Sequence, residues 1–213
     1  MTHRARLFHG HSEHLVQLFD EPDSRVEGVA NFLYRGWVSG APLLVVVRPS
    51  NWALIHARLT AKGCPVAEMA VEGRLVVLDA VRTVAYFFDE SPDPWIFQEQ
   101  IGATVARLSK FGRLYAYGEM VDILAEQARF DTAHELEMLW NQLAARESIT
   151  LLCGYASAHF GDVRDAEALQ RICRAHTGAQ ADEADLLGTW LLNDRQSRYH
   201  TEQGSSRVAP RSD

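Results

Sequence analysis

The residues of this chain best suited to chemistry lie at the ends of predicted buried strands. Glu119 follows the apolar segment 114–117, with Gly118 between them, and a helix is expected to begin next. Open parallel sheets bind ligands at the carboxyl ends of their strands. Glu119 is therefore a ligand contact or general base, with Asp122 one helical turn further on, or a first-turn carboxylate that stabilises the helix N-terminus. The local pattern alone favours the second interpretation, because acidic first turns are common.

A second group of reactive side chains lies around another predicted strand terminus. Cys153 and Tyr155 sit where the apolar segment 149–154 ends, so both could line the same pocket. A catalytic pair of Cys153 with His159 has no identified third group to orient the histidine. Cys173 and His176 could join Cys153 as metal ligands, but no CxxC pair accompanies them. Buried apolar thiols are the favoured interpretation.

Histidines gather near the N-terminus, where His14 precedes the first predicted strand and His3, His9 and His11 lie upstream. Their spacing matches no structural zinc pattern, so we expect no metal site and no cofactor. Asn141 is a polar residue beside a buried helical stripe, which indicates a hydrogen-bonding role. A structural role is favoured over ligand contact for this amide. We expect a ligand site lined by His14, Tyr117, Glu119, Asn141 and Tyr155, with no catalytic residue.

Apolar segments that read as strands alternate with amphipathic segments that read as helices. Strands are predicted over 14–19, 41–48, 73–78, 113–117 and 149–154. Helices are predicted from 24 to 36 or 40 and over 49–62, 79–89, 95–110, 120–127, 130–146, 165–176 and 184–192. Ser24 is the expected N-cap of the first helix, Gly63 the stop of the second, and Asp79 the cap of the third. This alternation predicts a three-layer α/β/α fold with a mostly parallel central sheet.

Composition sets the broad class. The 213 residues carry a net charge of −7, and no basic stripe is present, which argues against direct nucleic-acid binding. The longest apolar run, 43–47, is too short to span a bilayer, and the N-terminal residues lack the apolar stretch of a signal peptide, so we expect a cytoplasmic protein. We divide the chain into a flexible arm (1–13), one domain (14–192) and a polar tail (193–213), with 201–213 expected to be disordered.

Phosphate-binding motifs are absent from the sequence. Neither GxxxxGK[ST] nor GxGxxG occurs. The first strand–helix junction, residues 20–24, is acidic, contains a proline and lacks glycine. Carboxylates at this junction would repel a polyphosphate, which argues against ordinary ATP hydrolysis.

Several motifs resemble one family. The strings AYGEMV (116–121), LEMLWN (136–141) and LLCGY (151–155) are the most specific, and weaker matches extend from about residue 14 to residue 176. In these strings the chain resembles the methanogen/methylotroph DcmR-type sensory (MEDS) domain. The resemblance implies a RecA/KaiC-like core that has lost its P-loop, with Glu119 near the position of the metal-binding acid of those ATPases. It also implies a sensory input module for small organic compounds.

Our leading hypothesis is a sensory domain without enzymatic activity. A small ligand or a degenerate nucleotide would bind at the carboxyl ends of the strands, and the domain would regulate a histidine kinase or transcription regulator in trans, since the sequence shows no kinase, receiver or helix-turn-helix segment. A homo-oligomer is compatible with this reading. Two alternatives stay open, a protein-interaction scaffold without a ligand (an adaptor or anti-regulator) and a divergent ATPase or hydrolase that uses Glu119 as its base.

Overall fold

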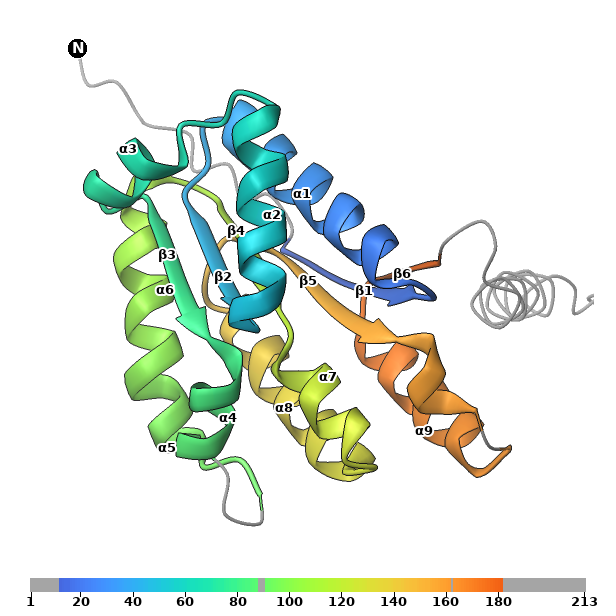
Figure 1. The fold of residues 1–213 in the computed structure, drawn as a ribbon. Helices are drawn as coiled ribbons and strands as arrows, with labels where there is room; N and C mark the ends of the chain where they lie inside the picture. Colours follow the sequence, from blue (N-terminus) through green and yellow to red (C-terminus); the bar gives the residue numbers. More distant parts are fainter. Residues whose placement is uncertain (1–11, 88–90, 162, 182–213) are drawn as a thin grey trace, which may run out of the picture.

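A parallel β-sheet of six strands forms the centre of the molecule (Figure 1). The computed structural model describes residues 12–87, 91–161 and 163–181. Within them the strand order is β3-β2-β4-β5-β1-β6, and every neighbouring pair is parallel. The strands are β1 (Glu13–Phe19), β2 (Leu43–Val47), β3 (Leu75–Asp79), β4 (Leu114–Gly118), β5 (Ile149–Ala156) and β6 (Gly178–Ala181).

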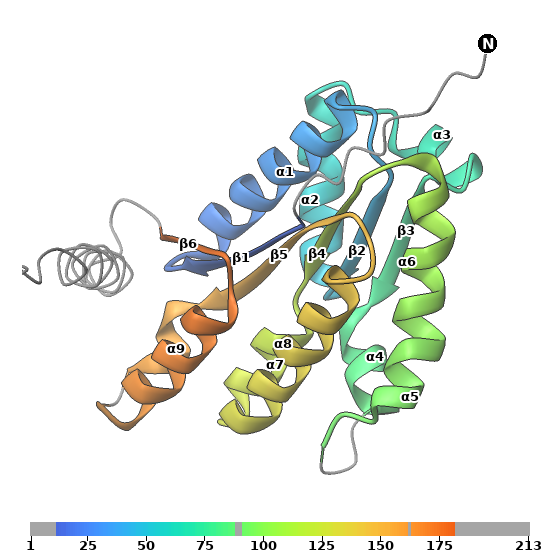
Figure 2. The same ribbon diagram turned by 180° about the vertical axis from the view of Figure 1, so that it is seen from behind.

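Helices cover both faces of this sheet, as the view from behind in Figure 2 also shows. One face packs against α1 (Pro22–Val38), α2 (Pro49–Ala61) and α3 (Val66–Val71). The opposite face packs against α4 (Ala80–Phe87), α5 (Pro94–Phe97), α6 (Ala103–Leu108), α7 (Met120–Glu126), α8 (Phe130–Ala144) and α9 (Val163–Ala175). The predicted three-layer α/β/α architecture is confirmed.

The core divides into two apolar layers because the strands are buried on both sides. All five residues of β2 are buried, which is why Leu43–Val47 has a continuous rather than an alternating apolar sequence. Alternate residues of β5 face opposite layers: Cys153 and Tyr155 belong to the layer under α8, whereas Leu152 belongs to the layer under α1. The pairing of β4 with β5 sets Gly118 beside Cys153, so the two predicted strand termini are neighbours.

The local predictions differ from the structure in several places. Ser24 is not an N-cap, because α1 begins at Pro22, whose fixed φ suits the first turn, and the Ser24 hydroxyl donates to the carbonyl of Glu21 inside that turn. The single helix predicted over 95–110 is interrupted by a π-helical segment, Gln98–Gly102. The predictions for Gly63 (φ 84°) and Asp79, which accepts from the backbone N–H of Val81, are confirmed.

Two elements had no counterpart among the predictions, namely α3 and the edge strand β6. β1 begins at Glu13, one residue before the predicted strand. The helix predicted over 184–192, the tail 193–213 and residues 1–11 of the arm lie outside the described residues. Among the described helices, none combines the length and apolarity that a membrane span needs.

Candidate functional site

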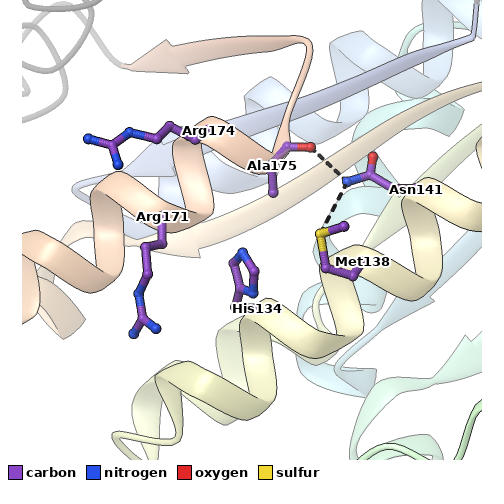
Figure 3. A pocket seen from close by; sticks show the side chains of 6 residues that line it. All are labelled: His134, Met138, Asn141, Arg171, Arg174 and Ala175. Carbon is purple, nitrogen blue, oxygen red and sulfur yellow. Dashed lines mark hydrogen bonds between the residues drawn. The ribbon is translucent and has the colours of Figure 1, made fainter.

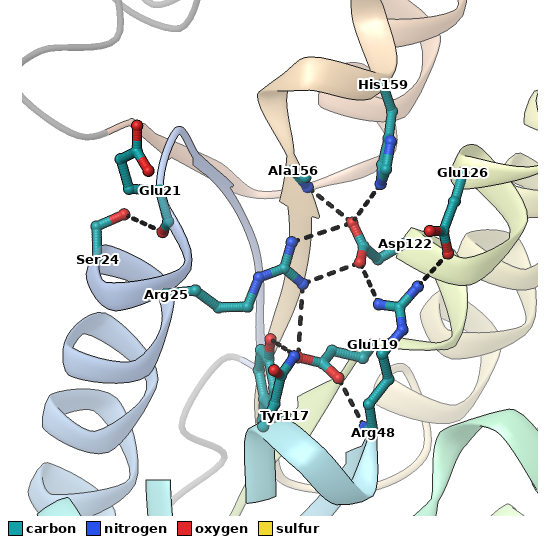
Figure 4. Close-up of polar contacts among 11 residues, drawn as sticks. Glu21, Ser24, Arg25, Arg48, Tyr117, Glu119, Asp122, Glu126, Ala156 and His159 are labelled. Atoms are coloured by element: carbon teal, nitrogen blue, oxygen red, sulfur yellow. Dashed lines mark hydrogen bonds and ion pairs between the residues drawn. The ribbon is translucent and has the colours of Figure 1, made fainter. Parts of the chain in front are cut away.

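Four charged side chains meet at the carboxyl end of β4, and we call Arg25, Arg48, Glu119 and Asp122 the arginine–carboxylate network (Figure 4). Arg25 comes from α1, Arg48 from the β2–α2 junction, and Asp122 from α7. Glu119 is fully buried and Asp122 is 2% exposed. The position is the one at which open sheets bind ligands.

Glu119 lies between β4 and α7, but its carboxylate does not cap the helix. Its Oε2 accepts the backbone N–H of Arg48 at 2.7 Å. Its Oε1 accepts from Asn51 at 2.7 Å and from the Tyr117 hydroxyl at 3.1 Å, and the Arg25 guanidinium is 3.5 Å away. The side chain therefore joins β4 to α1 and to the start of α2, and it does not stabilise the helix N-terminus as a cap.

Asp122 is the centre of the network. Arg25 donates to both of its carboxylate oxygens, at 3.0 and 3.2 Å, and Arg48 donates to Oδ2 at 2.5 Å. The backbone N–H of Ala156, the last residue of β5, donates to Oδ1 at 2.7 Å, and His159 Nε2 lies 3.2 Å from the same oxygen. One carboxylate thus connects α1, the β2–α2 junction and the end of β5.

Electrostatics keep Asp122 and Arg25 ionised. Burial by itself would raise the pKa of Asp122, but the hydrogen bond from His159 and the charge of Arg25 hold that pKa well below its ordinary value. Burial would lower the pKa of Arg25, yet nearby negative charge, including that of Asp122, raises it above its ordinary value. Burial and the charge of Glu119 raise the pKa of Tyr117, so its hydroxyl remains a donor at neutral pH.

A glycine on β5 leaves room for one of these donors. A Cβ at Gly154 would lie 2.8 Å from the Tyr117 hydroxyl and 2.9 Å from Cε2 of Phe19. The missing side chain allows Tyr117 to lie across β5 with its hydroxyl directed at Glu119.

A second polar group lies in the layer of the core that packs against α8. We call His14, Glu137, Cys153, Tyr155 and His176 the Glu137 cluster. All five are buried, with exposures of 0–3%. Glu137 Oε2 lies 3.2 Å from His14 Nε2 and 3.1 Å from Cys153 Sγ. Its Oε1 accepts from the Tyr155 hydroxyl at 2.7 Å and lies 3.3 Å from His176 Nε2. The elements involved are β1, α8, β5 and the residue after α9.

The outer nitrogens of both histidines have partners as well. His14 Nδ1 is 2.8 Å from Asn141 Oδ1, and the Asn141 amide nitrogen donates to the carbonyl of Ala175 at 2.8 Å. His176 Nδ1 is 2.7 Å from the carbonyl of Ile172. These contacts fix both rings with their Nε2 atoms directed at Glu137.

Burial also shifts the titration of the Glu137 cluster. It would raise the pKa of the Glu137 carboxyl, but the positive charge and hydrogen bonds of His176 and His14 hold that pKa well below its ordinary value. Burial, and then the charge of Glu137, raise the pKa values of Cys153 and Tyr155 well above their ordinary values.

A surface hollow of about 340 Å³ lies between α8 and α9, beside the Glu137 cluster (Figure 3). Its lining comprises His134, Met138, Asn141, Arg171, Arg174 and Ala175. Asn141 is the connection between the hollow and the buried cluster, because the same amide contacts both Ala175 and His14.

The five predicted ligand residues do not share one site. Tyr117 and Glu119 belong to the arginine–carboxylate network, whereas His14, Asn141 and Tyr155 belong to or support the Glu137 cluster. Their partners were not predicted: Arg25, Arg48, Asn51 and Glu137. Glu137 left a signal in the sequence, since it is an acid on the apolar helical stripe formed by Ala133, Leu136 and Trp140.

Comparison with known proteins supplies one family. The family model described as "MEDS: MEthanogen/methylotroph, DcmR Sensory domain" matches residues 13–177. Curated proteins give no match to this chain. The matched segment spans β1 to the end of α9, and it contains every residue of both polar groups.

Proposed function

This chain belongs to the MEDS family of sensory domains, and we propose that it binds a small organic ligand at the arginine–carboxylate network and thereby regulates a partner kinase or transcription regulator. The proposed role is binding without catalysis. The observation that carries the proposal is the position of Asp122, which links α1, the β2–α2 junction and the end of β5 through direct contacts.

Ligand access would be through Arg48. Its side chain is 21% exposed, and it connects the buried Asp122 to Glu126, whose side chain is 59% exposed. A ligand with oxygen acceptors would compete with Asp122 for the Arg48 guanidinium, which is suited to planar, bidentate acceptors. Loss of the Arg48–Asp122 contact would free the β2–α2 junction and shift the population of α2 positions.

Thermal melting of the full chain with a panel of small organic acids, alcohols, amines, halogenated hydrocarbons and nucleotides tests this proposal. We expect at least one compound to raise the melting temperature, with binding weakened at least tenfold in Arg48→Gln. Arg58→Gln is the matched control, because Arg58 lies on the exposed side of α2 and its guanidinium pairs with the exposed Glu27. If no compound binds, or if Arg48→Gln binds as well as the wild type, the proposal is wrong.

A scaffold without a ligand is the second candidate, favoured by the fact that Glu119 and Asp122 already have donors on all four carboxylate oxygens. The variants Glu119→Ala and Tyr117→Ala discriminate between the two. A scaffold would keep its partner regulation when both are changed. A hydrolase with Glu119 as base is disfavoured by the same donors, and nucleotide turnover abolished by Glu119→Gln would favour it instead.

A further inference from the structure

We propose that His14, Glu137, Cys153 and His176 bind one transition-metal ion of the zinc class. One ligand atom from each of these residues can be chosen so that all four lie within 4.8 Å of one another. The site shares no residue with the arginine–carboxylate network. The proposal is independent of small-ligand sensing, and either can fail alone.

The spacing of the ligand atoms approaches that of a tetrahedral site. Zinc bonds of about 2.0–2.1 Å to nitrogen or oxygen and about 2.3 Å to sulfur imply ligand–ligand edges of about 3.3–3.6 Å. The observed separations that share one Glu137 oxygen are 3.2 Å from His14 Nε2 to Glu137 Oε2, 3.1 Å from Cys153 Sγ to the same oxygen, and 3.3 Å from His14 Nε2 to Cys153 Sγ. Movements of about 1 Å would bring the remaining pairs, at up to 4.8 Å, to the same edge length.

The hydrogen bonds of the histidines place lone pairs toward the centre of the cluster. The Ile172 carbonyl can only accept, so His176 Nδ1 carries the proton. The Asn141 amide nitrogen donates to the Ala175 carbonyl, which leaves Asn141 Oδ1 as the acceptor for the Nδ1 proton of His14. In the neutral rings both Nε2 atoms then direct lone pairs at the Glu137 carboxylate. Acceptors that face one another in this way are stabilised by a cation between them.

The charge balance of the buried site accommodates a divalent ion. A divalent ion with the Glu137 carboxylate and a Cys153 thiolate sums to zero charge. The metal would also lower the pKa of the thiol, which is otherwise raised by burial.

The donor set identifies the class of ion. Two imidazole nitrogens, one thiolate and one carboxylate suit zinc and its chemical relatives, whereas calcium and magnesium prefer all-oxygen sites. The contacts to Asn141 and Ile172 are the outer hydrogen bonds that usually orient metal-binding histidines. The hollow between α8 and α9 reaches Asn141, which contacts His14.

The proposal departs from the sequence prediction that no metal binds. The sequence prediction considered Cys153 with Cys173 and His176 but not with His14, which is 139 positions from Cys153. The pairing of β1 with β5 places Val16 beside Cys153, and only this register brings His14 to the cluster.

Cobalt titration of the chelator-stripped full chain tests the site. We expect uptake of about one Co²⁺ per chain, a thiolate-to-cobalt absorption band in the near ultraviolet, and displacement of cobalt by Zn²⁺. We also expect zinc at a hundredfold excess over its dissociation constant to raise the melting temperature by about 5–10 °C.

Variants locate the ion. Cys153→Ser should abolish the thiolate band, and His176→Gln should weaken cobalt binding at least a hundredfold, whereas Cys64→Ala should change neither. Cys64 is the matched control because it is also a buried free thiol but lies in the opposite layer of the core. The proposal is overturned if the folded wild type takes up no cobalt, or if folded Cys153→Ser and His176→Gln bind it unchanged. The wild-type result decides the question even if a variant fails to fold.

Discussion

Asp122 and Glu137 are both carboxylates shielded from solvent, with exposures of 2% and 0%, but they are surrounded by different kinds of cation. Asp122 faces two guanidinium groups, which are always charged and can only donate. Glu137 faces two imidazoles, which can be neutral and then present lone pairs. The first network is electrostatically complete within the protein. The charge balance of the Glu137 cluster depends on whether a proton or a metal ion binds to it.

The two regions are connected through the end of β5. Tyr155 donates to Glu137, and the next residue, Ala156, donates through its backbone N–H to Asp122. A change in occupancy of the Glu137 cluster would therefore reach the arginine–carboxylate network across one peptide bond. The guanidinium groups, which are always charged, hold α1, the β2–α2 junction and the end of β5 together. A change in the charge of the imidazoles around Glu137 could move the end of β5.

The largest effect is expected from Asp122→Asn. This change leaves Arg25 with Glu119 at 3.5 Å and Arg48 with the exposed Glu126 as their remaining carboxylate partners. Breaking a buried ion pair costs about 3–5 kcal/mol of unfolding free energy. Urea denaturation at pH 7 measures it. Glu126→Gln is the control, since it removes an exposed partner of Arg48 and should cost less than about 1 kcal/mol. Equal losses in the two variants would mean that the buried network does not hold the elements together.

A pair of tyrosine variants compares the two regions directly. Tyr117→Phe should cost about 1 kcal/mol of unfolding free energy, because Glu119 keeps its donors from Arg48 and Asn51. Tyr155→Phe should cost about 2 kcal/mol in the metal-free chain, where Glu137 has fewer fixed donors. Urea denaturation of both variants measures the two losses of unfolding free energy. A larger loss in Tyr117→Phe than in Tyr155→Phe would contradict the proposed difference between the two regions.

The smallest effect on stability is expected when the pH is lowered. The pKa of Asp122 is lowered in the folded chain relative to its ordinary value of 3.8, so its contribution to stability is complete well above that pH and is lost as the pH falls. Between pH 7 and pH 3.5 the stability advantage of the wild type over Asp122→Asn should shrink by about 0.6 kcal/mol. Parallel denaturation curves of the two proteins at each pH measure this. A gap that widens in acid would show that the sign of the pKa shift is wrong.

The sheet was predictable because its strands carry strong local signals. Leu43–Val47 is apolar at every position, and Glu119 follows a strand in a way that marks the carboxyl edge. The partners of Glu119 were not predictable, since Arg25 and Arg48 reach it only through the order of the strands. The edge strand β6, with the sequence GAQA, has no apolar pattern to reveal it. The five predicted ligand residues separate into two sites according to the face of the sheet that each side chain points to. Predicting that separation would have required the register of the paired strands.

The position of β1 has a consequence for how the chain reaches its fold. β1 pairs only with β5 and β6, and His14 bonds through its backbone to Thr177, 163 positions later. β1 is therefore synthesised long before β5 and β6, and among the described strands it has no partner until almost the whole domain has been synthesised. Such distant pairing slows folding, and it leaves the apolar edge of β1 open to other strands in the meantime. We expect refolding to end with the insertion of β1 between β5 and β6, which would also be the step that assembles the Glu137 cluster.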